Sequence, residues 1–155
     1  MSEPSDTFSE KISSLLQANW SSTATGLQVS DVDWRHEKFD TMTETQHPTQ
    51  KAIIGTYNPP NAVSAEVLSA QTSFIHEAVV IDLFLHSGVL GGADNCLATR
   101  EKIRQFILQV IHQNATVLPG AVLMTFEGGY GRLEGPNEQR ECFKVVCSWF
   151  EVLPQ

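Results

Sequence analysis

The sequence predicts an α+β domain: a mainly antiparallel sheet with two helices packed on one face, which makes a two-layer sandwich. Two observations support this class. Two segments repeat apolar residues at the spacing of a helix, and several others alternate apolar and polar residues as strands do. The elements follow in the order helix, weak strand, strand, strand, helix, strand, strand. The 155 residues contain no internal repeat and no linker, so residues 1–155 are expected to form a single domain.

Both helices are predicted from a single apolar stripe. The first runs from about Thr7 to Trp20, and the second from near Leu97 to near Asn114. Polar side chains such as Arg100 are expected on the outside of the second helix, because a helix with one apolar stripe packs that stripe against a sheet. The apolar positions are Phe8, Ile12, Leu15 and Leu16 in the first helix and Ile103, Phe106, Ile107, Val110 and Ile111 in the second.

The other regular segments are predicted to be strands. In the clearest of them the odd-numbered residues from Val79 to Leu85 are all apolar, whereas the opposite face includes Asp82. The pair Gly128-Gly129 is expected to break or bulge the strand around it. The predicted strands span about 27–34, 51–57, 75–86, 121–133 and 140–152.

Two long irregular loops are predicted, at residues 35–50 and 58–74. The first is polar and rich in Thr, and the second begins at Asn58-Pro59-Pro60, which stops the preceding strand. Three apolar residues lie in the second loop: Val63, Val67 and Leu68. They could form a short helical turn, or they could stay mobile until another chain covers them, and we favour the second alternative. Long loops in compact domains are often functional, so assembly is expected to order both.

The composition disfavours several classes of function. Eighteen Asp and Glu oppose ten Lys and Arg, which gives a net charge of −8 and disfavours binding of nucleic acid through a basic patch. No apolar run approaches the roughly 20 residues that span a bilayer. Residues 1–6 lack the basic start and apolar block of a secretion signal. A soluble protein of the cell interior is therefore expected.

The sequence offers no set of residues typical of catalysis, cofactor binding or metal binding. It has no phosphate-binding loop and no nucleophile elbow. Cys142 and Cys147 are five residues apart on a predicted strand, so they point to opposite faces and cannot easily share a metal. We therefore expect no cofactor, no metal and no enzymatic activity. One local cluster of ionisable side chains is interpreted as a solvated outer sheet face: His76, Glu77, Asp82 and His86.

The order of the elements and several segments resemble a known family. The relevant features are the strand that ends at Pro59-Pro60, the apolar strand His76–Leu85, the early Arg100 of the second helix and the final strand Arg140–Val152. This combination is similar to the tail terminator (tail-completion or head–tail joining) proteins of tailed bacteriophages and archaeal tailed viruses. The similarity is one of order and pattern, and it extends from about Phe8 to Val152.

The resemblance implies a virion structural protein that caps the tail tube, ends its polymerisation and provides the joint to the head or neck. It implies a ring of identical subunits, six in the related proteins, with the tail tube protein and a neck or connector protein as partners. Neighbouring subunits would then cover open sheet edges and apolar loop residues. The ring would assemble in the host cytoplasm and lie at the head-proximal end of the tail. DNA would pass through it without specific binding, and no membrane would be involved.

Seven residues are candidates for contacts with other subunits or partners. For each of them, solvated surface or packing within the chain is the alternative. Three other functions stay open: another head-completion or neck connector protein, a small ligand-binding α+β domain, and a host-side adaptor. The candidates are charged residues at element ends and aromatic residues that flank the first long loop: Arg100, Arg104, Arg132, Glu134, Trp34, Phe39 and Tyr57.

Overall fold

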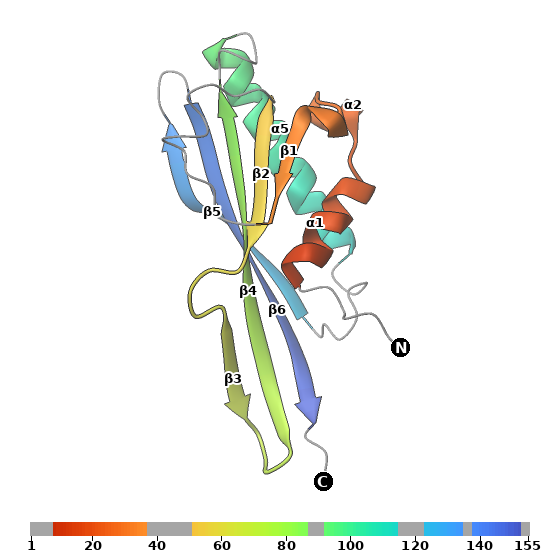
Figure 1. Cartoon of the computed structure of the whole chain (residues 1–155), viewed down its shortest axis with the longest axis vertical. Helices are drawn as coiled ribbons and strands as arrows, with labels where there is room; N and C mark the ends of the chain where they lie inside the picture. Colours follow the sequence, from red (N-terminus) through yellow and green to blue (C-terminus); the bar gives the residue numbers. More distant parts are fainter. Residues whose placement is uncertain (1–7, 37–50, 87–91, 115–122, 135–137, 153–155) are drawn as a thin grey trace.

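The computed structural model of the chain describes residues 8–36, 51–86, 92–114, 123–134 and 138–152 (Figure 1). For residues 86, 93, 123–134, 138 and 139 it describes the backbone alone. These ranges contain both helices and strands, so the mixed α and β content predicted from the sequence is confirmed. The elements are α1 (Phe8–Ala18), α2 (Ser22–Thr25), a 3-10 helix (Val29–Asp31), β1 (Val32–Arg35), β2 (Ala52–Tyr57), β3 (Val63–Val67), β4 (Thr72–His86), α5 (Ala93–Gln113), β5 (Leu123–Glu134) and β6 (Glu138–Val152).

The described strands form one six-stranded sheet in the order β1-β2-β4-β6-β5, and β3 pairs with β4 beyond the end of β2. The pairing of β1 with β2 is parallel, and the other four pairings are antiparallel. The longest pairing joins β4 to β6 over the full length of both strands, from Thr72 opposite Val152 to His86 opposite Glu138. The register of β5 against β6 shifts between Glu127 and Gly131, which agrees with the bulge predicted at Gly128-Gly129.

The main core lies between one face of the sheet and the two longer helices. The odd-numbered residues of β4 from Val79 to Leu85 are buried there, as the alternation in the sequence predicts. An aromatic contact joins the helices to the sheet, since the rings of Phe8 of α1 and Trp149 of β6 lie 4.9 Å apart. A second contact lies among the helices, where Trp20 is 5.0 Å from Phe106 of α5. The other members that the helices contribute include Ile12 and Leu16 of α1 and Ile103, Phe106, Ile107, Val110 and Ile111 of α5.

The prediction of an irregular loop over residues 58–74 is wrong. Residues Val63–Val67 form β3, and β4 begins at Thr72, so most of this segment is a β-hairpin. The N–H groups of Leu68 and Ser69 both donate to the carbonyl of Thr72 and close the turn. The alternation in Val63-Ser64-Ala65-Glu66-Val67 was strand-like, but β4 supplies the hydrogen bonds that make it a strand. Of the loop predicted at 35–50, residues 37–50 lie outside the described part of the chain.

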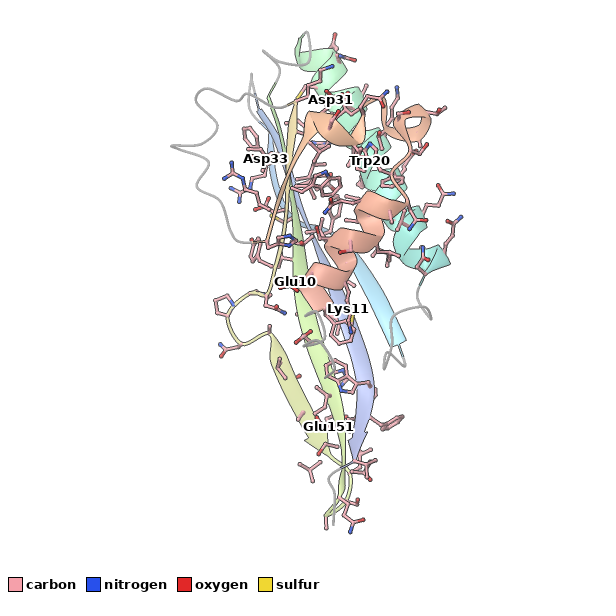
Figure 2. The ribbon with its side chains drawn as sticks, turned by 45° about the vertical axis from the view of Figure 1, so that its right-hand side comes forward. Glu10, Lys11, Trp20, Asp31, Asp33 and Glu151 are labelled. Atoms are coloured by element: carbon pink, nitrogen blue, oxygen red, sulfur yellow. The ribbon has the colours of Figure 1, made fainter. Side chains whose placement is uncertain are left out.

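A three-stranded arm extends beyond the helices. We use this name for residues 63–67, 72–77 and 147–152, which belong to β3, β4 and β6. Figure 1 shows these strands continuing past the ends of α1 and α5, and Figure 2 shows Glu151 on the arm, away from Glu10 and Lys11 of α1. Large apolar side chains are exposed on and beside the arm, Val67 by 77% and Val152 by 67%. Val63, Leu68 and Phe150 are each more than half exposed.

We predict that Ile107→Ala lowers the free energy of unfolding by about 2–5 kcal/mol, because it leaves a cavity between α5 and the sheet. Ile107 is completely buried. Leu97→Ala on the same helix is the matched control, since Leu97 is exposed, and it should change stability by less than about 1 kcal/mol. Urea denaturation measures both values. Equal losses for the two variants would contradict the described packing of α5.

Candidate functional site

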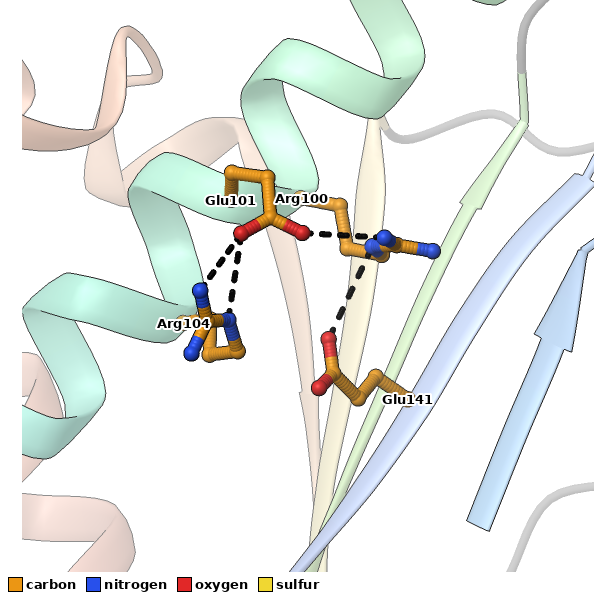
Figure 3. A network of polar contacts seen from close by, with 4 residues as sticks. All are labelled: Arg100, Glu101, Arg104 and Glu141. Atoms are coloured by element: carbon orange, nitrogen blue, oxygen red, sulfur yellow. Dashed lines mark hydrogen bonds and ion pairs between the residues drawn. The ribbon is translucent and has the colours of Figure 1, made fainter. Parts of the chain in front are cut away.

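Two arginines and two glutamates connect α5 to the sheet (Figure 3). Arg100 lies 3.6 Å from the carboxylate of Glu141 on β6, and both side chains are nearly inaccessible, at 3% and 2% exposure. Arg100 also donates to Glu101 at 2.9 Å, and Arg104 donates to the other oxygen of Glu101 at 2.6 Å. We call these four residues the α5–β6 charge network. It holds a buried ion pair between the helix and the sheet, where removal of one partner leaves an uncompensated charge.

The network explains the pKa of Glu101. Hydrogen bonds from Arg104 and then Arg100 lower this pKa from 4.5 to about 2, against a smaller opposing effect of burial. Because the folded state lowers the pKa, the stabilisation that Glu101 provides is present above pH 4.5 and is lost as the pH falls toward 2. Glu101 is about one-third exposed, so solvent screening keeps this contribution small, on the order of 1 kcal/mol or less.

The expectation that Arg100 lies on the outside of its helix is wrong. Arg100 precedes Ile103 by three residues and Ile107 by seven, so it continues the apolar stripe toward the start of α5. The buried carboxylate of Glu141 is what makes this position tolerable for a cation. Arg104 is about one-third exposed and is held by Glu101. The proposed roles of both arginines in contacts between subunits stay predictions.

A second charged cluster lies on the opposite face of the sheet. Asp82 of β4 is completely buried and accepts two hydrogen bonds from Arg140, from Nε at 3.0 Å and from Nη2 at 2.5 Å. The Cys142 thiol donates to the same carboxylate at 3.3 Å. We call these residues the Asp82 cluster. The bond with Asp82 raises the pKa of Arg140. Burial first, and the Asp82 charge second, raise the pKa of Cys142 to about 12.

The interpretation of Asp82 as part of a solvated face is therefore wrong for this residue. Its neighbours on the same face, Val80 and Phe84, are also buried, and Phe84 packs with Ile53 of β2. A lone carboxylate in an apolar row needs a cation, and the register of β4 with β6 supplies Arg140 at the position opposite Phe84. The apolar neighbours of Asp82 in the sequence were the available signal. The side chain of His86 lies outside the described part of the structure.

His76 is partly buried and belongs to the arm. Its Nδ1 lies 2.9 Å from the hydroxyl of Ser148, and its ring lies nearly perpendicular to that of Phe74, with the ring centres 4.6 Å apart. Phe74 in turn contacts the exposed Phe150 at 4.9 Å. This face of the arm therefore carries an aromatic row with one hydrogen-bonded imidazole, and it presents no arrangement of groups typical of a reaction.

Of the other predicted interface residues, the two whose side chains are described, Trp34 and Tyr57, lie on opposite faces of the sheet. Trp34 packs against the core edge, where its ring contacts Trp20 at 5.3 Å and its indole N–H donates to the carbonyl of Val29. Tyr57 is half-buried at the end of β2, on the sheet face of the Asp82 cluster. Phe39 lies outside the described residues. The backbones of Arg132 and Glu134 pair with Glu141 and Gln139, but their side chains lie outside the described part.

Two features of the described residues bear on a chemical site: their metal-ligating side chains and one hollow between helices. These residues contain no group of three His, Cys, Asp or Glu that could hold a metal ion. A hollow of about 250 Å³ lies between α2 and α5, and its lining consists of amides, a serine and apolar groups such as Phe106 and Val110. That volume is below the roughly 300–1,000 Å³ common for ligand pockets. Within the described ranges, no helix is both long and apolar enough to cross a lipid bilayer.

We predict that Arg100 and Glu141 are strongly coupled in stability. Arg100→Met and Glu141→Gln should each lower the free energy of unfolding by about 3–5 kcal/mol, because each removes the buried ion pair between α5 and β6 and keeps the opposite charge in place. The double variant should lose less than the sum of the two. Chemical denaturation of the four proteins gives the coupling energy. Lys102→Met, at an exposed position of α5, is the control and should change stability by about 0.5 kcal/mol at most. Additive losses would contradict the ion pair.

We also predict that Cys142 resists alkylation in the folded protein. With a pKa of about 12, it should react at pH 8 at least about a hundred-fold more slowly than an unfolded peptide cysteine. Mass spectrometry after timed alkylation with N-ethylmaleimide identifies the labelled thiol. Asp82→Asn removes the nearby negative charge and should speed labelling of Cys142 in molecules that remain folded. Labelling of wild-type Cys142 as fast as the free peptide would be inconsistent with the Asp82 cluster.

Comparison with known proteins adds no family to this geometry: no protein-family model matches the chain, and no curated protein matches it significantly.

Proposed function

We propose that the chain is a virion structural protein of the tail terminator type. In this role it forms a ring that caps the tail tube and provides the joint to the head or neck. The single observation that supports it best is the arm. Three strands extend past the helices with exposed apolar side chains, which is the kind of surface that other subunits cover in an assembly.

The edges of the arm support an assembly in which the same contact repeats. Among the described residues, β3 pairs with β4 alone, so its other edge is open. The described pairing of β5 with β6 begins at Ser148, so within the described part of the chain residues 149–152 of β6 pair with β4 on one edge only. Two different open edges on one subunit suit a head-to-tail contact, and such contacts close into rings when the rotation allows. In the proposed two-layer sandwich, with both longer helices on one sheet face, the arm extends past the helices from its root, where Phe8 of α1 contacts Trp149.

The charge of the chain agrees with passage of DNA through such a ring. Between Lys51 and Arg100 the sequence has no Lys or Arg, and none follows Lys144. The arm belongs to these two tracts, and its exposed charged residues are Glu66 and Glu151. A ring lined by such strands would repel DNA and let it move without being held. In this proposal the partners are further copies of the chain, the tail tube protein and a neck protein, and another neck or head-completion role is the alternative.

We predict that the wild-type protein forms rings and that new charges introduced on the arm by substitution prevent ring formation. Val67→Asp and Val152→Asp place a carboxylate at highly exposed positions of β3 and β6, so the fold should survive while the apolar contact is lost. Val29→Asp is the matched control, because Val29 is also exposed but lies in the 3-10 helix. Light scattering after size-exclusion chromatography gives the mass, and negative-stain microscopy shows the shape.

The expected result is a ring with a central hole for the wild type and for Val29→Asp, and a folded monomer for the two arm variants. A stable wild-type monomer at high concentration would contradict the proposal. So would rings that persist in both arm variants, because the arm would then not make the contact.

A further inference from the structure

Glu77 occupies an unusual position at the root of the arm. It lies on the helix-side face of β4, between Val63 of β3 and Cys147 of β6 in the register of the sheet. Cys147 is completely buried in the main core. The Oε2 atom of Glu77 has no contact with solvent and accepts no hydrogen bond from any described residue. A carboxylate oxygen in this situation favours the protonated form, because only the neutral carboxyl tolerates the loss of water.

The first turn of α1 covers this region. Phe8 stacks on Trp149, which follows Cys147 by two residues on the same face of β6. Lys11 lies with its ammonium group 5.4 Å from the centre of the Phe8 ring. The charged and titratable groups that act on one another here are Lys11 of α1, Glu77 of β4 and Cys147 of β6. Within the described residues, no ion pair of 4 Å or less joins Lys11 to Glu77.

We propose that protonation of Glu77 controls how firmly the first turn of α1 closes over the root of the arm. With a neutral Glu77 the turn stays closed, and Phe8 covers Trp149. When Glu77 is ionised, its partly buried carboxylate gains free energy as its shielded Oε2 atom reaches water, so the turn opens more often. Opening adds Phe8 and Trp149 to the exposed apolar surface of the arm. The device thus sets the size of the surface available for contacts, and it operates in the single chain, whether or not rings form.

The direction of the pH dependence follows from the burial. Burial raises the pKa of Glu77 above 4.5, and the charge of Lys11 opposes this in part. The closed state therefore binds the proton more tightly than the open state. The stabilisation of the closed turn is complete below pH 4.5 and is lost as the pH rises through the raised pKa. Each unit by which the pKa exceeds that of an exposed carboxyl changes the opening equilibrium about ten-fold.

Amide hydrogen exchange tests this proposal in monomeric protein. In a helix the N–H groups of Ile12 and Ser13 donate to the carbonyls of Phe8 and Ser9, so their exchange reports opening of the first turn. After correction for the intrinsic rate, protection of these amides should rise several-fold from pH 7.5 to 4.5 in the wild type. Glu77→Gln mimics the neutral acid, and its protection should be high at both pH values. Glu151→Gln, on the same sheet face but exposed, should behave as the wild type.

Two results would overturn the proposal. One is a Glu77→Gln variant whose protection changes with pH as in the wild type. The other is a carboxyl ¹³C titration that places the pKa of Glu77 at or below 4.5. Neither result depends on oligomeric state, so failure here is distinct from failure to form rings.

Discussion

The antiparallel pairing of β4 with β6 is the constraint on which the rest of the structure depends. Each strand has 15 residues, and the register runs without interruption from one end to the other. Alternation along this pair separates two environments: one face buries apolar side chains under α1 and α5, and the other carries the Asp82 cluster. Both charged clusters include residues of β6. Glu141 belongs to the α5–β6 charge network, and its neighbours Arg140 and Cys142 belong to the Asp82 cluster. Adjacent residues of one strand therefore bind charged groups on opposite faces of the sheet.

The length of this pair also explains the arm. Fifteen strand residues extend roughly 50 Å, whereas the 21 residues of α5 extend roughly 31 Å and the 11 residues of α1 roughly 16 Å. Helices of this length cannot cover the whole strand pair, so one end of the pair extends beyond both described helices. The hairpin formed with β3 widens this bare end to three strands. Exposed apolar residues on both faces and open edges on both sides follow from the same geometry, and Glu77 lies where the covered part ends.

The sequence predicted the periodic features well because each depends on local spacing. The helical stripe from Ile103 to Ile111, the alternation from Val79 to Leu85 and the bulge at Gly128-Gly129 all agree with the structure. Features set by distant partners were missed. Arg100 is buried beside Glu141, an ion-pair partner that lies 41 positions later in the sequence, on β6. Asp82 is buried beside Arg140, which strand pairing brings to it. β3 was missed for the same reason, since its hydrogen bonds come from β4. A pattern within one segment cannot reveal a partner in another.

The central claim is that the arm is a contact surface that stays uncovered in the single chain. The most direct test is hydrogen exchange, followed by mass spectrometry, at the edges of the arm. It is measured at protein concentrations below and above the concentration at which the protein assembles. The β3 residues 63–67 and the β6 residues 149–152 should exchange fast in the monomer and slowly in the assembled protein, while the centre of β4 stays protected in both. Equal exchange of the arm before and after assembly would contradict the claim, because the contact would then lie elsewhere.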